Sequence, residues 1–340
     1  MRRILVTGGA GFIGSNFLQY ILEDHLDIQV VNLDLLTYAG HLENLENCDR
    51  DPRYHFIHGD VCDRTVLGRV FSEFEIDTVV HFAAESHVDR SITNPAIFLT
   101  TNVLGTQALL DTARSFWTTE PDNPYSREYR SGVKFLQVST DEVYGSLGAE
   151  GMFSETMQLS PNSPYSASKA AADLVVLAYY RTYGLPVNIT RCSNNYGPFQ
   201  YPEKLIPLMI RNALADKPLP VYGDGLQIRD WLHVRDHCTA IERVLEHGRP
   251  GEVYNVGGHN ERANIEIVKL ILHELKKPET LISYVRDRLG HDRRYAIDSA
   301  KIAVELGWHP VYSFEDGIRE TIQWYAAHPA WLRREEERQI

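Results

Sequence analysis

The chain has 340 residues, 43% of them hydrophobic and 24% charged, which is ordinary for a soluble globular protein of one large or two smaller domains. Its formal net charge of −12 argues against a nucleic-acid-binding surface. No apolar run approaches the roughly 18 residues of a membrane span, so a membrane protein is not expected. Four separate cysteines (Cys48, Cys62, Cys192, Cys238) without a CxxC pair indicate buried, reduced thiols rather than a metal site.

Short apolar segments alternate with helical patterns along the first half of the chain. Strands are predicted at Arg3–Thr7, Ile28–Asp34, Tyr54–Asp60, Thr78–Ala84, Lys134–Ser139 and Val187–Cys192, with a seventh candidate at Val253–Gly258. Helices are expected to begin near Phe12, Arg64, Pro95 and Pro164. Asn94 and Ser163 each provide a capping side chain before a proline at the first helical position. This alternation predicts an α/β fold with a doubly wound parallel sheet.

After about residue 191 the pattern changes, and proline, glycine and aromatic residues cluster. Two later helices are predicted near 264–276 and 313–326, the second opened by the near capping box "SFED". We expect a large lobe formed by residues 1–191 and about 230–256, and a second, smaller lobe formed by 192–229 and 257–335. Residues 117–132 are predicted to form a surface loop, and the final "RREEERQI" a solvated tail. Because a strand begins almost at once, we expect no signal peptide and a cytoplasmic protein.

The stretch "VTGGAGFIG" follows the first predicted strand and opens the first helix. The spacing of Gly8, Gly11 and Gly14 permits a tight turn that brings a dinucleotide pyrophosphate close to N–H groups at a helix N-terminus. Asp34 lies twenty residues past Gly14, at the end of the second strand, where a carboxylate accepts hydrogen bonds from a ribose diol. No arginine stands beside Asp34, so NAD is favoured over NADP. A glycine turn with an unrelated surface acid is the alternative interpretation.

Tyr165 and Lys169, in "YSASK", are four residues apart and share a helix face. A free tyrosine titrates near ~10, and a neighbouring ammonium, aided by the positive nicotinamide ring, is expected to lower that pKa by stabilising the phenolate. A surface tyrosine and lysine would give the same pattern by chance. Because the pair follows an NAD motif, we interpret it as proton-handling machinery.

Asp141 and Glu142 lie side by side in "STDEVYG", where a predicted buried strand ends. Adjacent like charges cost free energy, and the ends of parallel strands commonly carry active sites. Two such carboxyls can act as an acid and a base if their surroundings separate their pKa values. Alternation along a strand would direct them oppositely, so both reach one ligand only if the strand breaks there into a turn. A solvated strand end is the alternative.

The chain resembles the extended short-chain dehydrogenase/reductase family over nearly its whole length. The motifs and residues that carry this resemblance occur in the expected order: "TGGAGFIG", Asp34, Asp60, "AAES", Thr140, "YSASK", "CSNNYGP" and "IRDW". The resemblance implies a Rossmann lobe that binds NAD, a small nucleotide-sugar lobe, and an active site between them. It also implies a catalytic triad of Thr140, Tyr165 and Lys169.

Within that family, "STDEVYGS" and "AAESHVDRS" resemble the dTDP-glucose 4,6-dehydratases. The resemblance implies a hydro-lyase in which Tyr165 and NAD oxidise C4 of dTDP-glucose. Glu142 then removes the C5 proton, Asp141 protonates the departing C6 hydroxyl, the hydride returns to C6 and a proton returns to C5 to give dTDP-4-keto-6-deoxyglucose. GDP-mannose dehydratases and UDP-glucuronate decarboxylases usually have serine in place of Asp141.

Several alternatives stay open at this point. The same reaction on UDP-glucose is the nearest, although UDP-glucose 4,6-dehydratases more often read Gln-Thr-His where this chain has "ESH". Another NAD-dependent nucleotide-sugar epimerase or dehydratase is the next. A non-enzymatic NAD-sensing module would typically lack Tyr165 or Lys169. A scaffold protein would leave the acid pair unexplained.

The resemblance also implies ligand contacts. The expected NAD-binding residues are Gly8, Gly11, Phe12, Ile13, Gly14, Asp34, Leu35, Leu36, Thr37, Asp60, Val61, Phe82, Ala83, Ala84, Glu85, Ser86, Thr101, Tyr165, Lys169 and Asn195. The expected substrate-binding residues are Ser86, His87, Thr140, Asn194, Lys204, Leu205, Pro220, Val221, Tyr222, Arg229, Asn264, Arg288 and His291. Arg229 and Arg288 suit a diphosphate because a guanidinium matches phosphate geometry. His81, His233 and His237 lack ligand spacing, so we expect no metal.

Two predicted helical regions, Pro95–Phe116 and Tyr165–Tyr183, carry broad apolar faces. They offer more apolar surface than one sheet face can cover. We therefore expect a homodimer through these helices, as the family resemblance also implies.

Overall fold

The computed structural model describes residues 2–332. Its centre is a parallel sheet of seven strands in the order β10-β6-β5-β4-β1-β2-β3. The strands are β1 Arg2–Thr7, β2 Ile28–Asp34, β3 Tyr54–His58, β4 Thr78–His81, β5 Lys134–Thr140, β6 Val187–Cys192 and β10 Val253–Val256. All of their pairings are parallel, so every strand ends at the same edge of the sheet.

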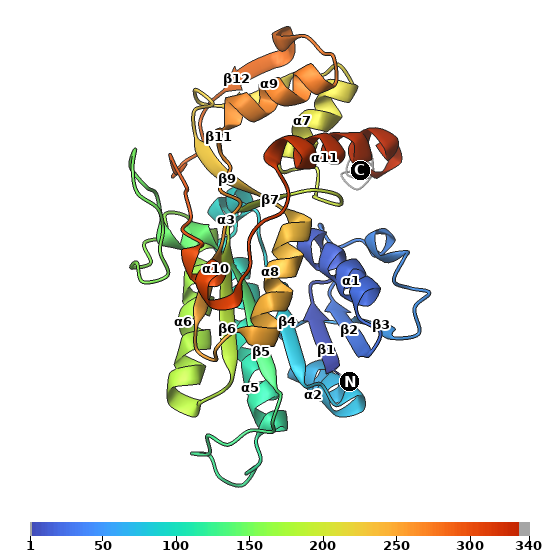
Figure 1. The fold of residues 1–340 in the computed structure, drawn as a ribbon, viewed down its shortest axis with the longest axis vertical. Helices are drawn as coiled ribbons and strands as arrows, with labels where there is room; N and C mark the ends of the chain where they lie inside the picture. The colour runs from blue at the N-terminus through green and yellow to red at the C-terminus, as the bar shows by residue number, and fades with distance from the viewer. Residues whose placement is uncertain (1, 333–340) are drawn as a thin grey trace.

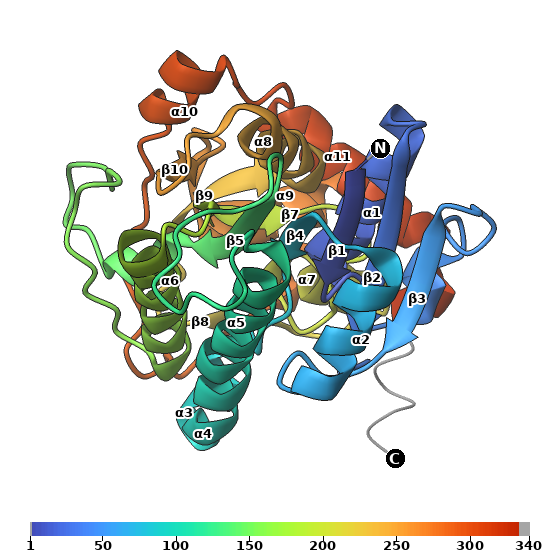
Figure 2. The ribbon, with the colours of Figure 1, turned by 90° about the horizontal axis from the view of Figure 1, so that it is seen from below.

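Helices cover both faces of this sheet (Figures 1 and 2). The helices on one face are α2 Arg64–Phe74, α5 Thr106–Trp117 and α6 Pro164–Tyr183, whose apolar residues form one core with the sheet. Those on the other face are α1 Phe12–Asp24, α8 Val234–His247 and α10 Ala300–Leu306, which form a second core. The predicted α/β fold with a doubly wound, Rossmann-like sheet is confirmed.

A smaller group of elements lies beyond the carboxyl ends of the strands, at the top of Figure 1. A three-stranded sheet contains β7 Asn194–Tyr196, β9 Ile228–His233 and β11 Glu261–Ala263, and a two-stranded sheet pairs β8 Leu219–Tyr222 with β12 Ile282–Val285. The helices α7 Leu205–Leu214, α9 Asn264–Glu274 and α11 Phe314–Ala327 share a separate apolar core with them. The 3-10 helix η4 Glu279–Leu281 precedes β12.

Several short elements line the boundary between the two groups. They are the 3-10 helices η1 Leu42–Leu45 and η3 Asp141–Tyr144, the helices α3 Val88–Thr93 and α4 Pro95–Phe98, and the π-helical segment η2 Leu99–Gly105 that joins α4 to α5. Each leads away from the carboxyl end of a strand or connects such a segment to a longer helix. The chain therefore brings many loop residues to one edge of the sheet.

The predicted helix starts at Phe12, Arg64, Pro95 and Pro164 are all confirmed. Ser163 caps α6 in a capping box with Ser166, and Ser163 Oγ accepts a hydrogen bond from the Ser166 N–H at 3.1 Å. Asn94 was expected to cap in the same way, and that prediction is wrong. Asn94 directly follows α3, and its own N–H bonds to the Arg90 carbonyl, while its side chain makes no cap bond.

Three strands end earlier than predicted: β3 at His58, β4 at His81 and β10 at Val256. The predicted surface loop contains Trp117, which is instead fully buried at the end of α5 and donates its indole N–H to the Ile76 carbonyl. The predicted tail, residues 333–340, lies outside the described residues. Over residues 2–332, no helix combines the length and apolarity needed to cross a membrane.

Candidate active site

The glycine loop lies between β1 and α1 and has little space for side chains. Gly8 has φ +74°, and a Cβ there would lie 2.6 Å from the Ala83 nitrogen. A Cβ on Gly14 would clash with the Gly8 carbonyl. Gly11 begins α1 without any side-chain cap, and no acid stands in the first turn. The first N–H groups of α1 are thus available to an anion, which fits a dinucleotide pyrophosphate. Phe12, Ile13 and Gly14 form this turn as predicted.

Asp34 ends β2 beside that loop and is buried. Its Oδ2 accepts from the Ala10 N–H at 2.9 Å, and its Oδ1 accepts from the Leu36 N–H at 2.8 Å. Each carboxylate oxygen can accept a further bond, so the group fits a ribose diol. Burial raises the pKa of Asp34, and the two N–H donors oppose that effect. Leu35, Leu36 and Thr37 follow in the next loop, where Leu36 adopts φ 53°.

The segments that follow β3 and β4 complete this edge. Asp60 accepts from the Cys62 N–H at 2.8 Å, and the neighbouring Val61 is buried. The segment after β4 contains Phe82, Ala83, Ala84, Glu85 and Ser86, all partly buried. Thr101 lies in η2, next to the buried Asn102. The structure thus places the predicted cofactor residues of the first four strands at the carboxyl edge of one sheet.

Asn102 is a residue that the sequence analysis missed. Its amide bonds both backbone groups of Glu85, at 2.8 Å to the N–H and 3.0 Å to the carbonyl, and also the Ser168 hydroxyl at 2.8 Å. Asn102 is 1% exposed. It therefore fixes the segment after β4 against α6. An asparagine within an apolar helical pattern was the available signal.

The acid pair lies in a turn. β5 ends at Thr140, and η3 begins at Asp141. Thr140 Oγ1 accepts the Glu142 N–H at 3.3 Å and caps the turn, and it lies 3.3 Å from Asp141 Oδ1. The strand break that both carboxyls need in order to reach one ligand is confirmed.

Asp141 and Glu142 have different surroundings. Asp141 is 1% exposed, and its Oδ2 has no hydrogen-bond partner among the described residues. Burial, then the neighbouring Glu142 and Asp230, raise the pKa of Asp141 well above its ordinary value. Burial also raises the pKa of Glu142, but three cations (Lys204, Arg229 and Arg288) oppose that rise. Asp141 is therefore suited to carry a proton and Glu142 to accept one.

Tyr165 and Lys169 lie in the first two turns of α6, and both are buried. Burial, Glu142, Cys192 and Asp141 raise the pKa of Tyr165 well above its ordinary value, and a hydrogen bond with Thr140 opposes this. The protein's own groups therefore do not lower the pKa of Tyr165, and the expected lowering by Lys169 together with the positive nicotinamide ring stays a prediction for the NAD-bound site. Lys169 donates to the Val138 carbonyl at 2.8 Å, and burial lowers its pKa.

The smaller lobe contributes cations toward Glu142. Lys204 donates to the Ser86 carbonyl at 3.0 Å, which joins the two lobes. Arg229 is buried, donates to the Asp292 carbonyl at 3.0 Å and lies over the Tyr295 ring at 4.2 Å. Tyr295 in turn donates to Asp292 Oδ2 at 2.5 Å. Asp292 and Tyr295 were not predicted, although they lie in the same stretch, residues 287–295, as the predicted Arg288 and His291.

Arg288 and His291 lie in the loop after β12. Arg288 pairs with Asp89 of α3, with 2.7 Å between Nε and Oδ1. His291 Nδ1 lies 2.6 Å from Asp287 Oδ1, and burial lowers the pKa of His291. Asp89 was not predicted. This loop crosses from the smaller lobe onto α3.

The remaining predicted ligand residues come from β7, α7, β8, α9 and the start of α3. Asn194 and Asn264 each have a buried side-chain oxygen with no partner among the described residues. His87 caps α3 through Nδ1, which accepts from the Arg90 N–H at 3.2 Å, and burial lowers its pKa to about 4. Asn195 donates to the Ser193 carbonyl and contacts His237 at 2.9 Å. Leu205 opens α7, and Pro220, Val221 and Tyr222 form most of β8.

Within residues 2–332, no group of three or more His, Cys, Asp or Glu side chains could hold a metal ion. His81 bonds Thr7 at 2.6 Å and Thr106 at 3.0 Å, a structural role as expected. All four cysteines are free. Cys62 is only partly buried, so the expectation of a buried thiol is wrong there.

The chain is similar to nucleotide-sugar dehydratases. A family model described as GDP-mannose 4,6 dehydratase matches residues 5–321. A dTDP-glucose 4,6-dehydratase of Neisseria meningitidis is 54% identical, over 97% of this chain and 95% of the relative, and one of Escherichia coli is 51% identical, over 98% and 96%.

Solved structures agree. A dTDP-glucose 4,6-dehydratase of Bacillus anthracis in complex with NAD is 50% identical with a TM-score of 0.89, covering 98% of this chain and all of that one. One from Streptomyces venezuelae with NAD bound is 49% identical with a TM-score of 0.89, covering 97% and 98%. The chain therefore belongs to the dTDP-glucose 4,6-dehydratase family of extended short-chain dehydrogenases/reductases.

Proposed function

We propose that the protein is an NAD-dependent hydro-lyase that converts dTDP-glucose to dTDP-4-keto-6-deoxyglucose. The observation that carries this proposal is the turn η3, which places Asp141 and Glu142 together in opposed surroundings beside Tyr165. Oxidation of a sugar hydroxyl needs no carboxyl pair, whereas elimination of water across C5–C6 needs both an acid and a base. The family relationship supports the same reaction.

The chain's own residues fit NAD. Gly8 and Gly14 let the backbone of the loop pack closely before the uncapped start of α1, and Asp34 is held in place to accept from a ribose. Bound NAD supplies the acceptor and then the donor for the hydrogen that moves from C4 to C6. Asp60, Val61, the 82–86 segment, Thr101 and Asn195 are the proposed further contacts.

Tyr165 is the proposed acceptor of the 4-hydroxyl proton. Thr140 opposes the rise in the pKa of Tyr165, although burial and the nearby carboxyls still raise that pKa overall. Lys169 is tied to the Val138 carbonyl, so its ammonium stays next to the end of β5. The three side chains thus form a proton-handling group at the strand end, with Thr140 orienting the sugar oxygen.

Elimination follows from the acid pair. A ketone at C4 acidifies the C5 proton, and Glu142 removes it because nearby cations favour the ionised carboxyl. Asp141 gives its proton to the C6 hydroxyl, which leaves as water. Burial and like charges keep Asp141 protonated until that step. The two neighbours can therefore act in opposite senses at one pH.

The smaller lobe is proposed to hold the nucleotide diphosphate. Lys204, Arg229 and Arg288 supply positive charge near Glu142. The unpartnered oxygens of Asn194 and Asn264 are available to ligand donors. Ser86, His87, Leu205, Pro220, Val221, Tyr222 and His291 are proposed to complete the site. We assign residues 192–229 and 257–335 to this lobe, and 1–191 with about 230–256 to the NAD lobe; residue 1 and residues 333–335 of these ranges lie outside the described residues. Ile302 and Leu306 of α10, however, pack with the core of the large sheet.

We also propose a homodimer. Large apolar side chains are exposed on the neighbouring helices α4, η2, α5 and α6: Ile97, Leu99, Leu104, Phe116 and Leu174. An exposed group of this kind commonly marks a protein–protein contact.

Four free cysteines support a reducing compartment such as the cytoplasm.

The decisive test follows one hydrogen. dTDP-glucose deuterated at C4 is supplied without added NADH, and the product is examined by mass spectrometry and NMR. We expect a product lighter by one water with deuterium at C6. Deuterium retained at C4 would indicate an epimerase, and deuterium lost to free cofactor would indicate an ordinary dehydrogenase. Parallel turnover of UDP-glucose measures how strictly the base is selected.

A further inference from the structure

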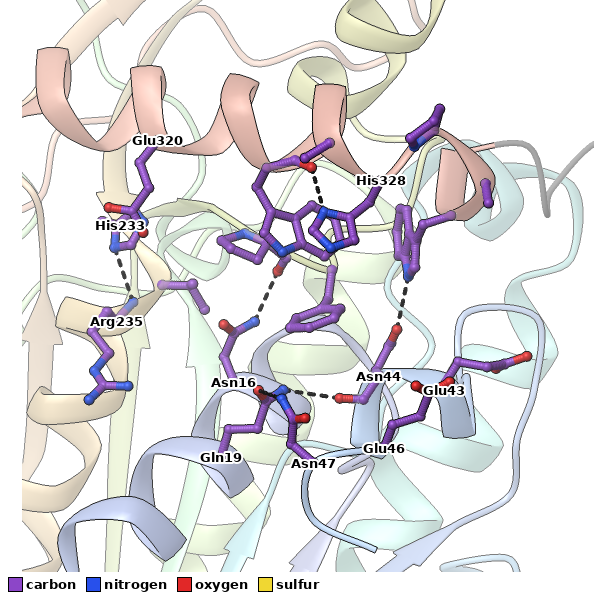
Figure 3. A pocket seen from close by; sticks show the side chains of 18 of the residues that line it. Asn16, Gln19, Glu43, Asn44, Glu46, Asn47, His233, Arg235, Glu320 and His328 are labelled. Carbon is purple, nitrogen blue, oxygen red and sulfur yellow. Dashed lines mark hydrogen bonds between the residues drawn. The ribbon is translucent and has the colours of Figure 1, made fainter.

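The end of the described chain connects to the glycine loop through successive hydrogen bonds. Trp331 Nε1 donates to Asn44 Oδ1 at 3.0 Å, the bond drawn beside Asn44 in Figure 3. Asn44 Nδ2 donates to the Ala10 carbonyl at 3.0 Å. Ala10 then donates its own N–H to Asp34 Oδ2 at 2.9 Å. Three hydrogen bonds therefore link an indole after α11 to the carboxylate expected to bind the NAD ribose.

This chain of bonds is buried. Asn44 is 2% exposed, Trp331 8% and Ala10 fully buried. Both ends of the Asn44 amide are used, and its backbone is fixed as well, since Gln19 Nε2 donates to the Asn44 carbonyl at 3.0 Å. A buried polar group that loses its partner costs more than an exposed one. The Asn44 side chain is thus held in one orientation from two sides.

Ala10 lies inside the glycine loop, between Gly8 and Gly14. Its carbonyl accepts from both Asn44 Nδ2 and the His41 N–H, each at 3.0 Å. The peptide plane at this point sets the direction of the loop N–H groups that approach a pyrophosphate. A contact that orients Ala10 therefore also orients the proposed NAD site.

Trp331 belongs to an aromatic cluster on the side of the smaller lobe. Its ring lies 5.7 Å from both Trp324 and Tyr325 of α11, and Tyr325 donates to the Gln200 carbonyl at 2.8 Å. A pocket of about 660 Å³ opens between α1, the η1 segment and α11 (Figure 3). The pocket lies between α1 and α11, and the Trp331–Asn44 hydrogen bond connects the η1 segment on one side of it to the turn after α11 on the other.

We propose that Asn44 and Trp331 are positioning residues for NAD: the turn after α11 holds the glycine loop in its NAD-binding form through Asn44 and Ala10. This inference rests on the NAD site of the proposed function. Trp331 thereby has a role in cofactor binding, although its side chain comes from the smaller lobe and connects to the glycine loop through Asn44.

The test compares two variants that cut the chain of bonds at different points. Trp331→Phe keeps an aromatic ring but removes the N–H donor. Asn44→Asp keeps an acceptor for the indole but places a carboxylate against the Ala10 carbonyl. On protein freed of cofactor, calorimetry should show the NAD dissociation constant rising about three- to tenfold for Trp331→Phe and more for Asn44→Asp. The dissociation constant of dTDP should stay within about twofold of wild type in both.

Two matched controls separate this role from general packing. Trp324→Phe makes the same change in the same cluster, and Asn47→Ala removes a neighbouring exposed amide that contacts only Gln19 Oε1 at 3.4 Å among its described hydrogen bonds. Both should keep wild-type NAD affinity. Wild-type NAD affinity in either Trp331→Phe or Asn44→Asp would overturn the inference, as would equal losses in Trp324→Phe or a parallel loss of dTDP affinity. A wild-type protein that binds no NAD would instead overturn the proposed function, and the inference with it.

Discussion

At the residue scale, Asp141 and Glu142 are covalent neighbours with different environments. Glu142 faces three cations, whereas Asp141 is packed among like charges with an oxygen that lacks a protein partner. A buried carboxyl without a protein partner lowers the stability of the folded protein, which is tolerated where the group is needed for function. The pair therefore affects both catalysis and stability, and these two properties can be measured separately.

Asp141→Asn should make the folded protein more stable at pH 7 by about 1–3 kcal/mol, because the wild-type carboxyl must take up a proton on folding and the amide need not. Burial raises the pKa of Asp141 above its unfolded value, so the stability of the wild type falls as pH rises through the folded pKa. The gain should accordingly shrink between pH 7 and pH 5. Urea unfolding at both pH values checks this, with Glu142→Gln as a control that should gain less. A variant no more stable than wild type at pH 7 would contradict the assignment.

At the element scale, the turn η3 determines what the acid pair can reach. Gly145 ends it with φ 89° and ψ −148°, a conformation open essentially to glycine, and its N–H returns to the Glu142 carbonyl at 3.2 Å. A Cβ at this position would meet the Ser160 backbone carbonyl. Tyr144 is fixed from behind, since its hydroxyl donates to Asn255 at 2.8 Å and accepts from Arg191 at 2.9 Å.

Gly145→Ala should lower stability by about 1–3 kcal/mol and reduce turnover further, because Glu142 would shift with the backbone. Gly148→Ala, in the same loop, has open space around it and no positive φ, so it should behave as wild type. Thermal unfolding and C5 proton exchange would be compared in the two variants. If both variants exchange at the wild-type rate, η3 does not position the base.

Most elements of the fold, but not all of their limits, could be predicted from the sequence. Strand and helix identities followed from the alternation of apolar segments, and two strands, Ile28–Asp34 and Val187–Cys192, have the predicted limits. The predicted ends of strands were wrong where apolar residues continue past the strand into the loop at the sheet edge, as after His81. A π-helical segment such as η2 has no distinct signal in a 3.6-residue pattern. The pairing of Asp89 with Arg288 spans 199 positions of the chain, so no local pattern could reveal it.

At the scale of the whole molecule, the proposed dimer is open to a direct test. Leu174 on α6 is 57% exposed among other apolar side chains. Leu174→Glu places a charge in the proposed contact, and light scattering after gel filtration should then give the monomer mass. Val304→Glu, at an equally apolar exposed site on α10, should leave the mass unchanged. A wild-type protein of monomer mass at micromolar concentration would refute the dimer.

The order of strands in the large sheet also governs how the chain can fold as it is made. β10 pairs with β6 only after the 60-odd residues that build β7, α7, β8, β9 and α8 have been added. A nascent chain that stops before Val253 therefore presents β6 as an open strand edge, which is a template for association with other chains. The first part of the smaller lobe, residues 192–229, is thus synthesised during an interval when the larger lobe is unfinished. Truncated products ending in that interval should depend on chaperones, whereas chains that have passed Val256 can close the sheet themselves.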